Sequence, residues 1–236
     1  MVRAGQGGDP TRTSQPTADD PSLAAIARAI EEFGRDHDPF AVEHEIQVTS
    51  YGGTGTTVLV NRLLDAGLSM PPGPGQWPHK HHWQPPAGDA VPPGFRAIYI
   101  AGDPRDALLS IFRRGYAVGR YHNLFNTEPG PEITARLETL EGFLAAGIDD
   151  FALADHVRSW RDHPRDYPVM FVRYDELGDA WPEIADFAGI PVDPPLDFQP
   201  RASDWRSLPE PLRTQLDELY GELAAVIEGW PPVEVT

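Results

Sequence analysis

The chain has 236 residues, of which 40% are hydrophobic, contains no cysteine and carries a formal net charge of −17. This size and composition predict one folded domain with a sizeable core, and the lack of cysteine excludes disulfide bonds and thiolate chemistry. The acidic charge argues against nucleic-acid binding, and no apolar run reaches the roughly 18 residues of a membrane span. The N-terminus lacks the layout of a secretory signal, so we expect a cytoplasmic protein with no membrane span.

The beginning of the chain differs in composition from the remainder. Residues 1–18 are rich in Gly, Thr, Ser, Gln and Pro, and this composition predicts a disordered N-terminal tail. Asp20 and Pro21 are typical of a helix start, with an apolar face following at helical spacing. We therefore expect residues 19–236 to form the folded domain.

A strand, a glycine turn and a helix are predicted between residues 45 and 66. Glycines stand at positions 52, 53 and 55, and Thr56 and Thr57 open the helix. Such a turn directs free backbone N–H groups and the positive end of a helix dipole at one point, where a phosphate fits. The same pattern also fits an ordinary strand-to-helix turn. Because Thr56, not lysine, precedes Thr57, the stretch does not match the loop of ATP- and GTP-hydrolysing enzymes.

The rest of the chain alternates between strand and helix signals. Strands are predicted at 95–101 and 168–173, helices at 104–116, 132–146, 151–162, 182–189 and 209–228, and loops at 69–94, 117–131 and 190–208. This alternation predicts an α/β fold with a central parallel sheet flanked by helices. Ligands bind beyond the carboxyl ends of such strands, so we expect the glycine turn, the turn at 102–105 and the segment after Tyr174 to share one edge.

The loop at 69–94 contains the densest group of chemically active side chains. His79, Lys80, His81 and His82 stand in a row, between Trp77 and Trp83. A neutral imidazole suits proton transfer near pH 7, whereas a solvated loop or a weak metal site would produce the same pattern. The cluster lacks a cysteine or carboxylate at ligand spacing, so we expect no structural metal.

Five separated pieces of the chain resemble the sulfotransferase family, in the same order. The pieces are SYGGTGTT at 50–57, KHH at 80–82, IYIAGDPRDALLSIFRR at 98–114, FVRYDEL at 171–177 and SDWR at 203–206. The resemblance covers roughly residues 45–225, and GDPRDALLS followed by VRYDEL is its most specific part. It implies a P-loop-type three-layer fold and transfer of a sulfonate from 3′-phosphoadenosine 5′-phosphosulfate to a small-molecule acceptor, with no metal.

The resemblance also assigns roles to single residues. His82 falls where the family has its catalytic base, and Lys80 would stabilise charge on the leaving phosphate. Ser110 would bind the 3′-phosphate. The cofactor-binding residues that the resemblance indicates are Gly52, Gly53, Thr54, Gly55, Thr56, Thr57, Arg105, Ser110 and Arg201.

Two positions depart from the family pattern. The family usually has Lys or Arg where this chain has Gly53, and Arg where it has Gly102. Losing charge-assisted contacts to a phosphate costs about 1.5–3 kcal/mol each, so other cations would have to replace them. The candidates are Arg62, Arg105, Arg113, Arg114 and Arg201. Arg105 is the first choice because it lies in the same turn as Gly102.

Three functions remain compatible with this sequence. The first is an active sulfotransferase acting on a small-molecule hydroxyl, with loop aromatics such as Trp77 and Tyr121 lining the acceptor site. The second is a relative that has lost catalysis and acts as a binding partner. The third is a transferase that uses another phosphorylated donor. The sequence indicates neither the acceptor nor the oligomeric state.

Overall fold

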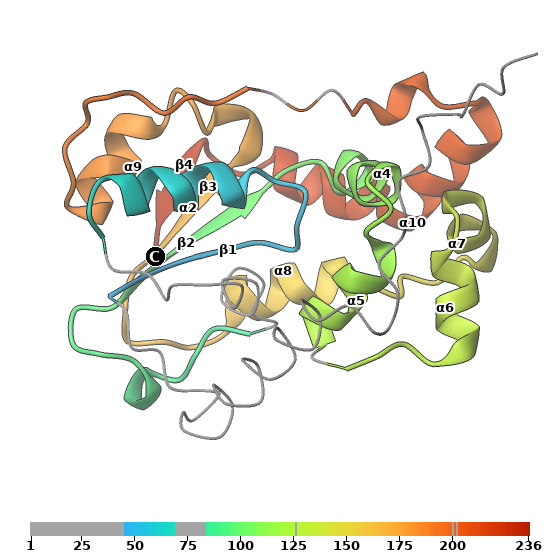
Figure 1. Cartoon of the computed structure of the whole chain (residues 1–236), viewed down its shortest axis with the longest axis horizontal. Helices are drawn as coiled ribbons and strands as arrows, with labels where there is room; N and C mark the ends of the chain where they lie inside the picture. The colour runs from blue at the N-terminus through green and yellow to red at the C-terminus, as the bar shows by residue number, and fades with distance from the viewer. Residues whose placement is uncertain (1–44, 69–83, 126, 200, 202) are drawn as a thin grey trace, which may run out of the picture. The chain divides into compact units, whose positions relative to one another are not determined.

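The computed structural model describes residues 45–68, 84–125, 127–199, 201 and 203–236, which belong to one compact unit of the chain. They form an α/β fold around a four-stranded sheet (Figure 1). Its strands are β1 (Ile46–Thr49), β2 (Arg96–Ala101), β3 (Val169–Arg173) and β4 (Val233–Val235), in that order across the sheet. The expected tail at 1–18 and the helix expected from Asp20 lie outside the described residues.

The first three strands are parallel, as the sequence predicts. In the ladder between β1 and β2, Val48 lies opposite Ile98. In the ladder between β2 and β3, Ile100 lies opposite Val172. Because side chains alternate between the faces of a strand, β2 supplies Ile98 and Ile100 to one core and Tyr99 to the other. Both faces are therefore buried, which explains the continuous apolar runs in the sequence.

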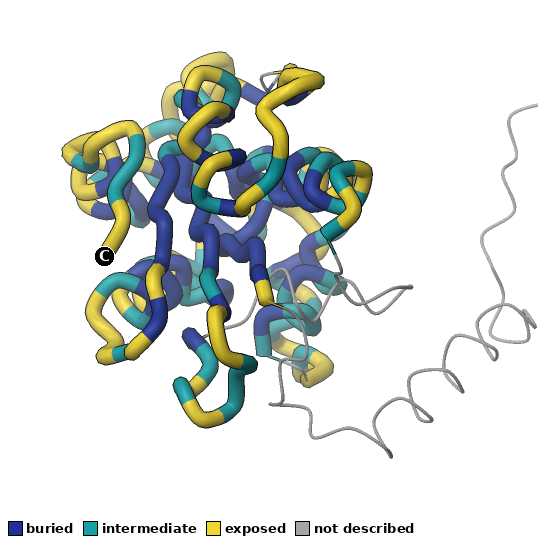
Figure 2. Tube along the Cα trace, turned by 90° about the vertical axis from the view of Figure 1, so that its left-hand side faces the viewer, coloured by how far each residue is buried: buried dark blue, intermediate teal, exposed yellow. Residues whose placement is uncertain are grey.

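Eight α-helices occur in the described part of the chain, and they cover both faces of the sheet (Figures 1 and 2). On one face, apolar residues of α2 and α9 pack against the strands, and on the other face the core includes residues of α4, α5, α6, α7, α8 and α10. Their bounds are α2 Thr56–Asp65, α4 Pro104–Arg113, α5 Ala117–Phe125, α6 Pro131–Leu137, α7 Leu140–Ala146, α8 Leu153–Asp162, α9 Trp181–Ala188 and α10 Glu210–Glu228.

Helix α4 shows how the sequence sets these elements locally. The Asp103 side chain accepts a hydrogen bond from the Arg105 N–H, and Pro104 occupies the first helical position, where no N–H is needed. Ala107, Leu108 and Ile111 follow at helical spacing and are buried in the core. The turn at 102–104 therefore both ends β2 and starts α4, as expected.

The structure corrects three sequence-based expectations. The predicted loop at 117–131 is wrong, because α5 occupies most of it. The predicted single helix at 132–146 is divided into α6 and α7, since Thr139 leaves the helical conformation and caps α7 through the Gly142 N–H. The sheet is not wholly parallel either, because β4 runs antiparallel to β3.

None of the helices in the described ranges combines the length and the apolar composition that crossing a membrane requires.

Candidate functional site

The glycine turn between β1 and α2 adopts a conformation that only glycines take easily. Gly52, Gly53 and Gly55 have φ angles of 98°, 69° and 77°. A Cβ on Gly53 would lie 3.0 Å from the Ala107 carbonyl oxygen of α4. A side chain at position 53 is therefore opposed by both backbone conformation and space.

The turn presents unused backbone donors. Among the described residues, none accepts a hydrogen bond from the N–H groups of residues 53–57, whereas those of Val58 and Leu59 are bound by the Gly55 carbonyl. Gly55 precedes α2 without a capping side chain. Free amides at a helix N-terminus are the usual setting for an anion.

The threonines of this turn have different surroundings. Thr54 is buried and donates its hydroxyl to the Ile100 carbonyl at 3.3 Å, so it holds the turn against β2. Thr56 is buried at the first position of α2, and Thr57 is exposed. Thr54 therefore offers a ligand only its amide, while Thr57 also has its hydroxyl at the surface.

Three strand ends meet at this turn, as expected from the parallel sheet. The Tyr51 hydroxyl donates to the Gly102 carbonyl and accepts from the Gly102 N–H at 2.9 Å. A Cβ on Gly55 would lie 3.2 Å from the ring of Tyr174, which follows β3. The predicted edge therefore contains all three segments.

Arg201 contacts Gly53 and lies close to Gly102, the two positions where the sequence has glycine instead of a cation. Its Nη1 donates to the Gly53 carbonyl at 2.9 Å, and its Nη2 is 2.7 Å from the place of a Cβ on Gly102. The guanidinium is centred 4.2 Å from the Tyr174 ring, whose hydroxyl accepts from the Arg201 N–H. Of the predicted replacements, Arg201 is thus the one that contacts the glycine turn.

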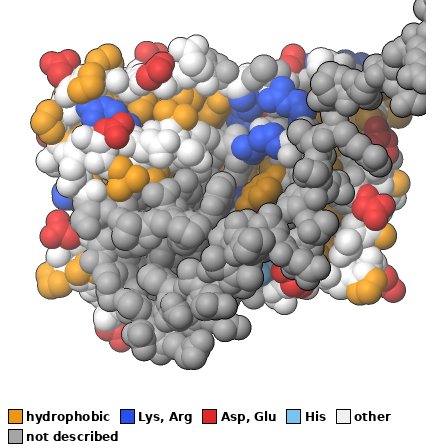
Figure 3. Space-filling model, viewed as in Figure 1, with side chains coloured by type: hydrophobic (Ala, Val, Ile, Leu, Met, Phe, Trp, Pro, Cys, Tyr) orange, Lys and Arg blue, Asp and Glu red, His pale blue; other side chains and the backbone are white. Residues whose placement is uncertain are grey.

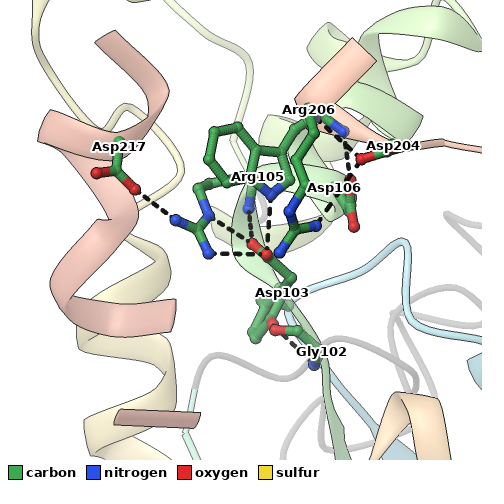
Figure 4. A network of polar contacts seen from close by, with 9 residues as sticks. Gly102, Asp103, Arg105, Asp106, Asp204, Arg206 and Asp217 are labelled. Carbon is green, nitrogen blue, oxygen red and sulfur yellow. Dashed lines mark hydrogen bonds and ion pairs between the residues drawn. The ribbon is translucent and has the colours of Figure 1, made fainter. Parts of the chain in front are cut away.

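Arg105, the first choice from the sequence, has a different environment. Its guanidinium forms an ion pair with Asp103 at 2.9 Å and another with Asp217 of α10, and it stacks on Trp205 at 4.2 Å (Figure 4). Trp205 in turn donates its indole N–H to Asp103 and its backbone N–H to Asp106. Asp103 of the turn and Asp106 of α4 therefore both anchor Trp205, and Arg105 completes this network.

The ionisation of Asp103 reflects these contacts. Burial alone would raise the pKa of Asp103, but hydrogen bonds from Arg105 and the positive charge of Arg105 hold it below its ordinary value of 3.8. The pKa of Arg105 is correspondingly raised by Asp103 and Asp217, against the opposing effect of its burial. The pair is therefore charged at neutral pH.

Arg120 of α5 is a site residue that sequence reasoning missed. It is 2% exposed, and its Nε donates to the Tyr51 carbonyl at 3.0 Å. Its guanidinium occupies the space where a Cβ on Gly52 would stand. No sequence signal marks it, because the segment was predicted to be a loop and its contacts arise only in the folded chain.

The remaining predicted residues are distributed as follows. Ser110 is 7% exposed on α4, and its carbonyl accepts from Arg114. Burial, and then the charges of Arg113 and Arg201, lower the pKa of Arg114, so positive charge gathers near this edge. Figure 3 shows arginine side chains grouped beside apolar ones on the face of the molecule that it presents. Lys80 and His82 lie outside the described residues.

A scan of the chain against protein-family models gives no match, and a search of curated proteins gives none either. The site is therefore interpreted from its own geometry. Free amides at a helix N-terminus, with Arg120 and Arg201 in contact with the turn, can together hold a small multivalent anion such as a phosphate or sulfate group.

Proposed function

We propose that the protein is a sulfotransferase-like enzyme of P-loop-type, three-layer architecture that binds 3′-phosphoadenosine 5′-phosphosulfate at the turn between β1 and α2. One observation carries the proposal: the N–H groups of residues 53–57 have no acceptor among the described residues, and Arg201 lies directly beside them. The acceptor in this proposal is the hydroxyl of a small molecule.

The fold brings an arginine to the two positions where the resemblance lacks a cation, and this supports the proposal. Gly53 and Gly102 cannot supply it, but Arg201 reaches both from a distant segment. A guanidinium is suited to this task because it binds phosphate and sulfate oxygens through two parallel hydrogen bonds. In this proposal, Arg201 replaces the cations that the family has at positions 53 and 102, so a positive charge still lies beside the turn.

The transfer step assigns work to residues of the loop at 69–94. In the proposal, the acceptor oxygen bonds to sulfur as the bond from sulfur to the 5′-phosphate oxygen breaks. His82 takes the acceptor's proton, and Lys80 stabilises the negative charge that develops on the leaving phosphate. The amides of the turn and Arg201 hold the transferred group in place.

Binding of 3′-phosphoadenosine 5′-phosphate, followed by calorimetry and by the unfolding midpoint, tests the donor site. A ligand that binds only the folded state raises that midpoint, so we expect a clear rise at micromolar nucleotide without added magnesium. Arg201→Gln removes one charge-assisted contact, about 1.5–3 kcal/mol, and should weaken binding by roughly tenfold to a hundredfold.

Transfer from the labelled donor to a panel of hydroxyl compounds tests the chemistry. His82→Ala should abolish transfer while the nucleotide still raises the unfolding midpoint. His163→Ala, at an exposed position, is the matched control and should change neither. Nucleotide binding without transfer to any compound would favour a binding protein, and binding of ATP with magnesium in place of the bisphosphate would favour another phosphorylated donor.

A further inference from the structure

Arg120 is a buried cation whose bonding is incomplete. Its Nη2 is inaccessible to solvent and has no hydrogen-bond partner among the described residues. An unpaired charged donor inside a protein is costly, because the group has lost its water without gaining an acceptor. Such groups are rare enough that each one requires an explanation.

The position of Arg120 is defined by the glycine turn itself. Its Nε donates to the Tyr51 carbonyl, and a Cβ on Gly52 would lie 2.1 Å from its Nη2. The guanidinium therefore lies against the backbone of the turn, so close that only glycine fits at position 52. The unpaired donor is thus adjacent to the free amides.

The electrostatic surroundings of Arg120 lack a counter-ion. The pKa of Arg120 is lowered to about 9, mainly by burial; the nearby Tyr116 and Tyr99 act to raise it, and the positive charge of Arg114 acts with burial to lower it. No carboxylate of the described residues forms an ion pair with it, although the chain as a whole is strongly acidic. The positive charge of Arg120 is therefore not balanced by a carboxylate in the part of the chain that the structure describes.

We propose that Arg120 is an anion-binding residue of the glycine turn, whose Nη2 donates to an oxygen of the terminal anionic group that the amides of residues 53–57 hold. This inference rests on the proposed function for the identity of the ligand, a phosphosulfate donor, but not for the binding of an anion. Position 53 cannot supply a positive charge, and in this proposal Arg120 of α5 supplies it from the side of the turn that faces the core.

Two nitrogens of the guanidinium have different roles in this proposal. The Nε bond to Tyr51 fixes the side chain to the turn, and the Nη2 donor is left for the ligand. A lysine carries the charge but has a single nitrogen, so it cannot occupy both positions in this geometry. Arg120→Lys should therefore bind the anion more weakly than the wild type, whereas a general effect of charge would leave the two affinities equal.

The test uses the full chain and two probes, inorganic diphosphate and 3′-phosphoadenosine 5′-phosphate. Calorimetry and the ligand-induced shift of the unfolding midpoint are measured for the wild type, Arg120→Met, Arg120→Lys and Arg158→Met. Arg158 is an exposed arginine paired with Asp155 on α8 and serves as the matched control. We expect Arg120→Met to lose roughly tenfold to a hundredfold in affinity for both probes, Arg120→Lys to be intermediate, and Arg158→Met to match the wild type.

The outcomes separate this inference from the proposed function. If the wild type binds diphosphate but not the nucleotide, and Arg120→Met loses diphosphate, Arg120 retains its role and the sulfotransferase assignment fails. If Arg120→Met binds both probes as tightly as the wild type, or if the wild type binds neither, the inference is wrong. If Arg120→Met does not fold, Arg120→Lys decides, and an unchanged affinity in that variant would overturn the inference.

Discussion

Two turns lie side by side at the carboxyl ends of neighbouring strands, and they differ in how their polar groups are used. In the turn after β2, Asp103 accepts from Arg105 and Trp205, and Asp106 accepts from the Trp205 backbone. In the turn after β1, the amides of residues 53–57 and the Arg120 Nη2 have no partner in the described structure. The first turn satisfies its own polar groups, whereas the second leaves backbone amides and one guanidinium nitrogen without a partner among the described residues.

This difference separates structural residues from the proposed binding residues more sharply than residue type does. Arg105 and Arg120 are both arginines beside these turns, but the first is paired with two carboxylates and the second with none. A paired guanidinium stabilises the fold, and an unpaired one retains its capacity for an external anion. Substitutions in the turn after β2 should therefore lower mainly the free energy of unfolding, and substitutions of Arg120 or Arg201 should lower mainly the affinity for an anion.

The largest effect is expected for Gly52→Ala. Its φ of 98° costs a non-glycine residue about 1–2 kcal/mol, and displacing the Arg120 guanidinium adds about 1–3 kcal/mol of overpacking. Gly67→Ala is the matched control, because Gly67 has a φ of 89° but nothing within 4 Å of its Cβ position. Chemical denaturation should show the larger loss for Gly52→Ala; equal losses would contradict the contact with Arg120.

A smaller loss, of about 2–3 kcal/mol, is expected for Asp103→Ala, which removes a helix cap and leaves Arg105 and the Trp205 indole without an acceptor. Asp103→Asn keeps the cap and loses the charge, so its unfolding free energy should fall by less. Neither variant should weaken diphosphate binding. A drop in affinity comparable to that of Arg201→Gln would show that the turn after β2 belongs to the binding site.

Introducing at position 102 the arginine of the sulfotransferase pattern should not strengthen the proposed anion binding. A Cβ on Gly102 would lie 2.8 Å from the Tyr174 Cβ and 2.7 Å from the Arg201 Nη2. Gly102→Arg should therefore lower stability by about 1–3 kcal/mol and displace Arg201 without tightening nucleotide binding. Tighter binding with unchanged stability, measured by calorimetry and denaturation, would mean that Arg201 is not the replacement.

The smallest effect concerns acid stability. Because the pKa of Asp103 is lowered in the folded state, its contribution is fully present above the ordinary value of 3.8 and is lost as pH falls through the lower folded value. Wild type should lose more stability than Asp103→Asn below about pH 4. The difference should be modest, since the pair is partly exposed and salt screens it; parallel pH profiles would contradict the assignment.

The main framework of the fold follows from the sequence, and the exceptions have physical causes. Strands β2 and β3 have continuous apolar runs, β1 has the β-branched Ile46 and Val48, and α4 has both a capping aspartate and a proline at its start. Helix α5 contains Gly119 and several weak helix formers, so its stability comes from packing of Ala117 and Leu124 on the core. Strand β4 has three residues, too few for any periodic signal, and is defined by its bonds to β3.

The candidate site was predictable in part. The glycine turn and its neighbours at the strand ends follow from the strand–turn–helix pattern and the parallel sheet. The sequence does not indicate which arginine lies at Gly53 and Gly102. Arg105 is next to Gly102 in the sequence, whereas Arg201 reaches Gly102 only in the folded chain. Arg120 could not be identified at all, since burial without a partner is a property of three-dimensional packing.

The contact between Arg201 and Gly53 joins residues 148 positions apart in the chain. Contacts of such long sequence separation form late, because closing the intervening chain costs entropy before any interaction compensates for it. During refolding, the sheet and its helices can assemble before Arg201 reaches the proposed anion site. Ligand capture would then mark the final stage of maturation, later than the recovery of helical circular dichroism.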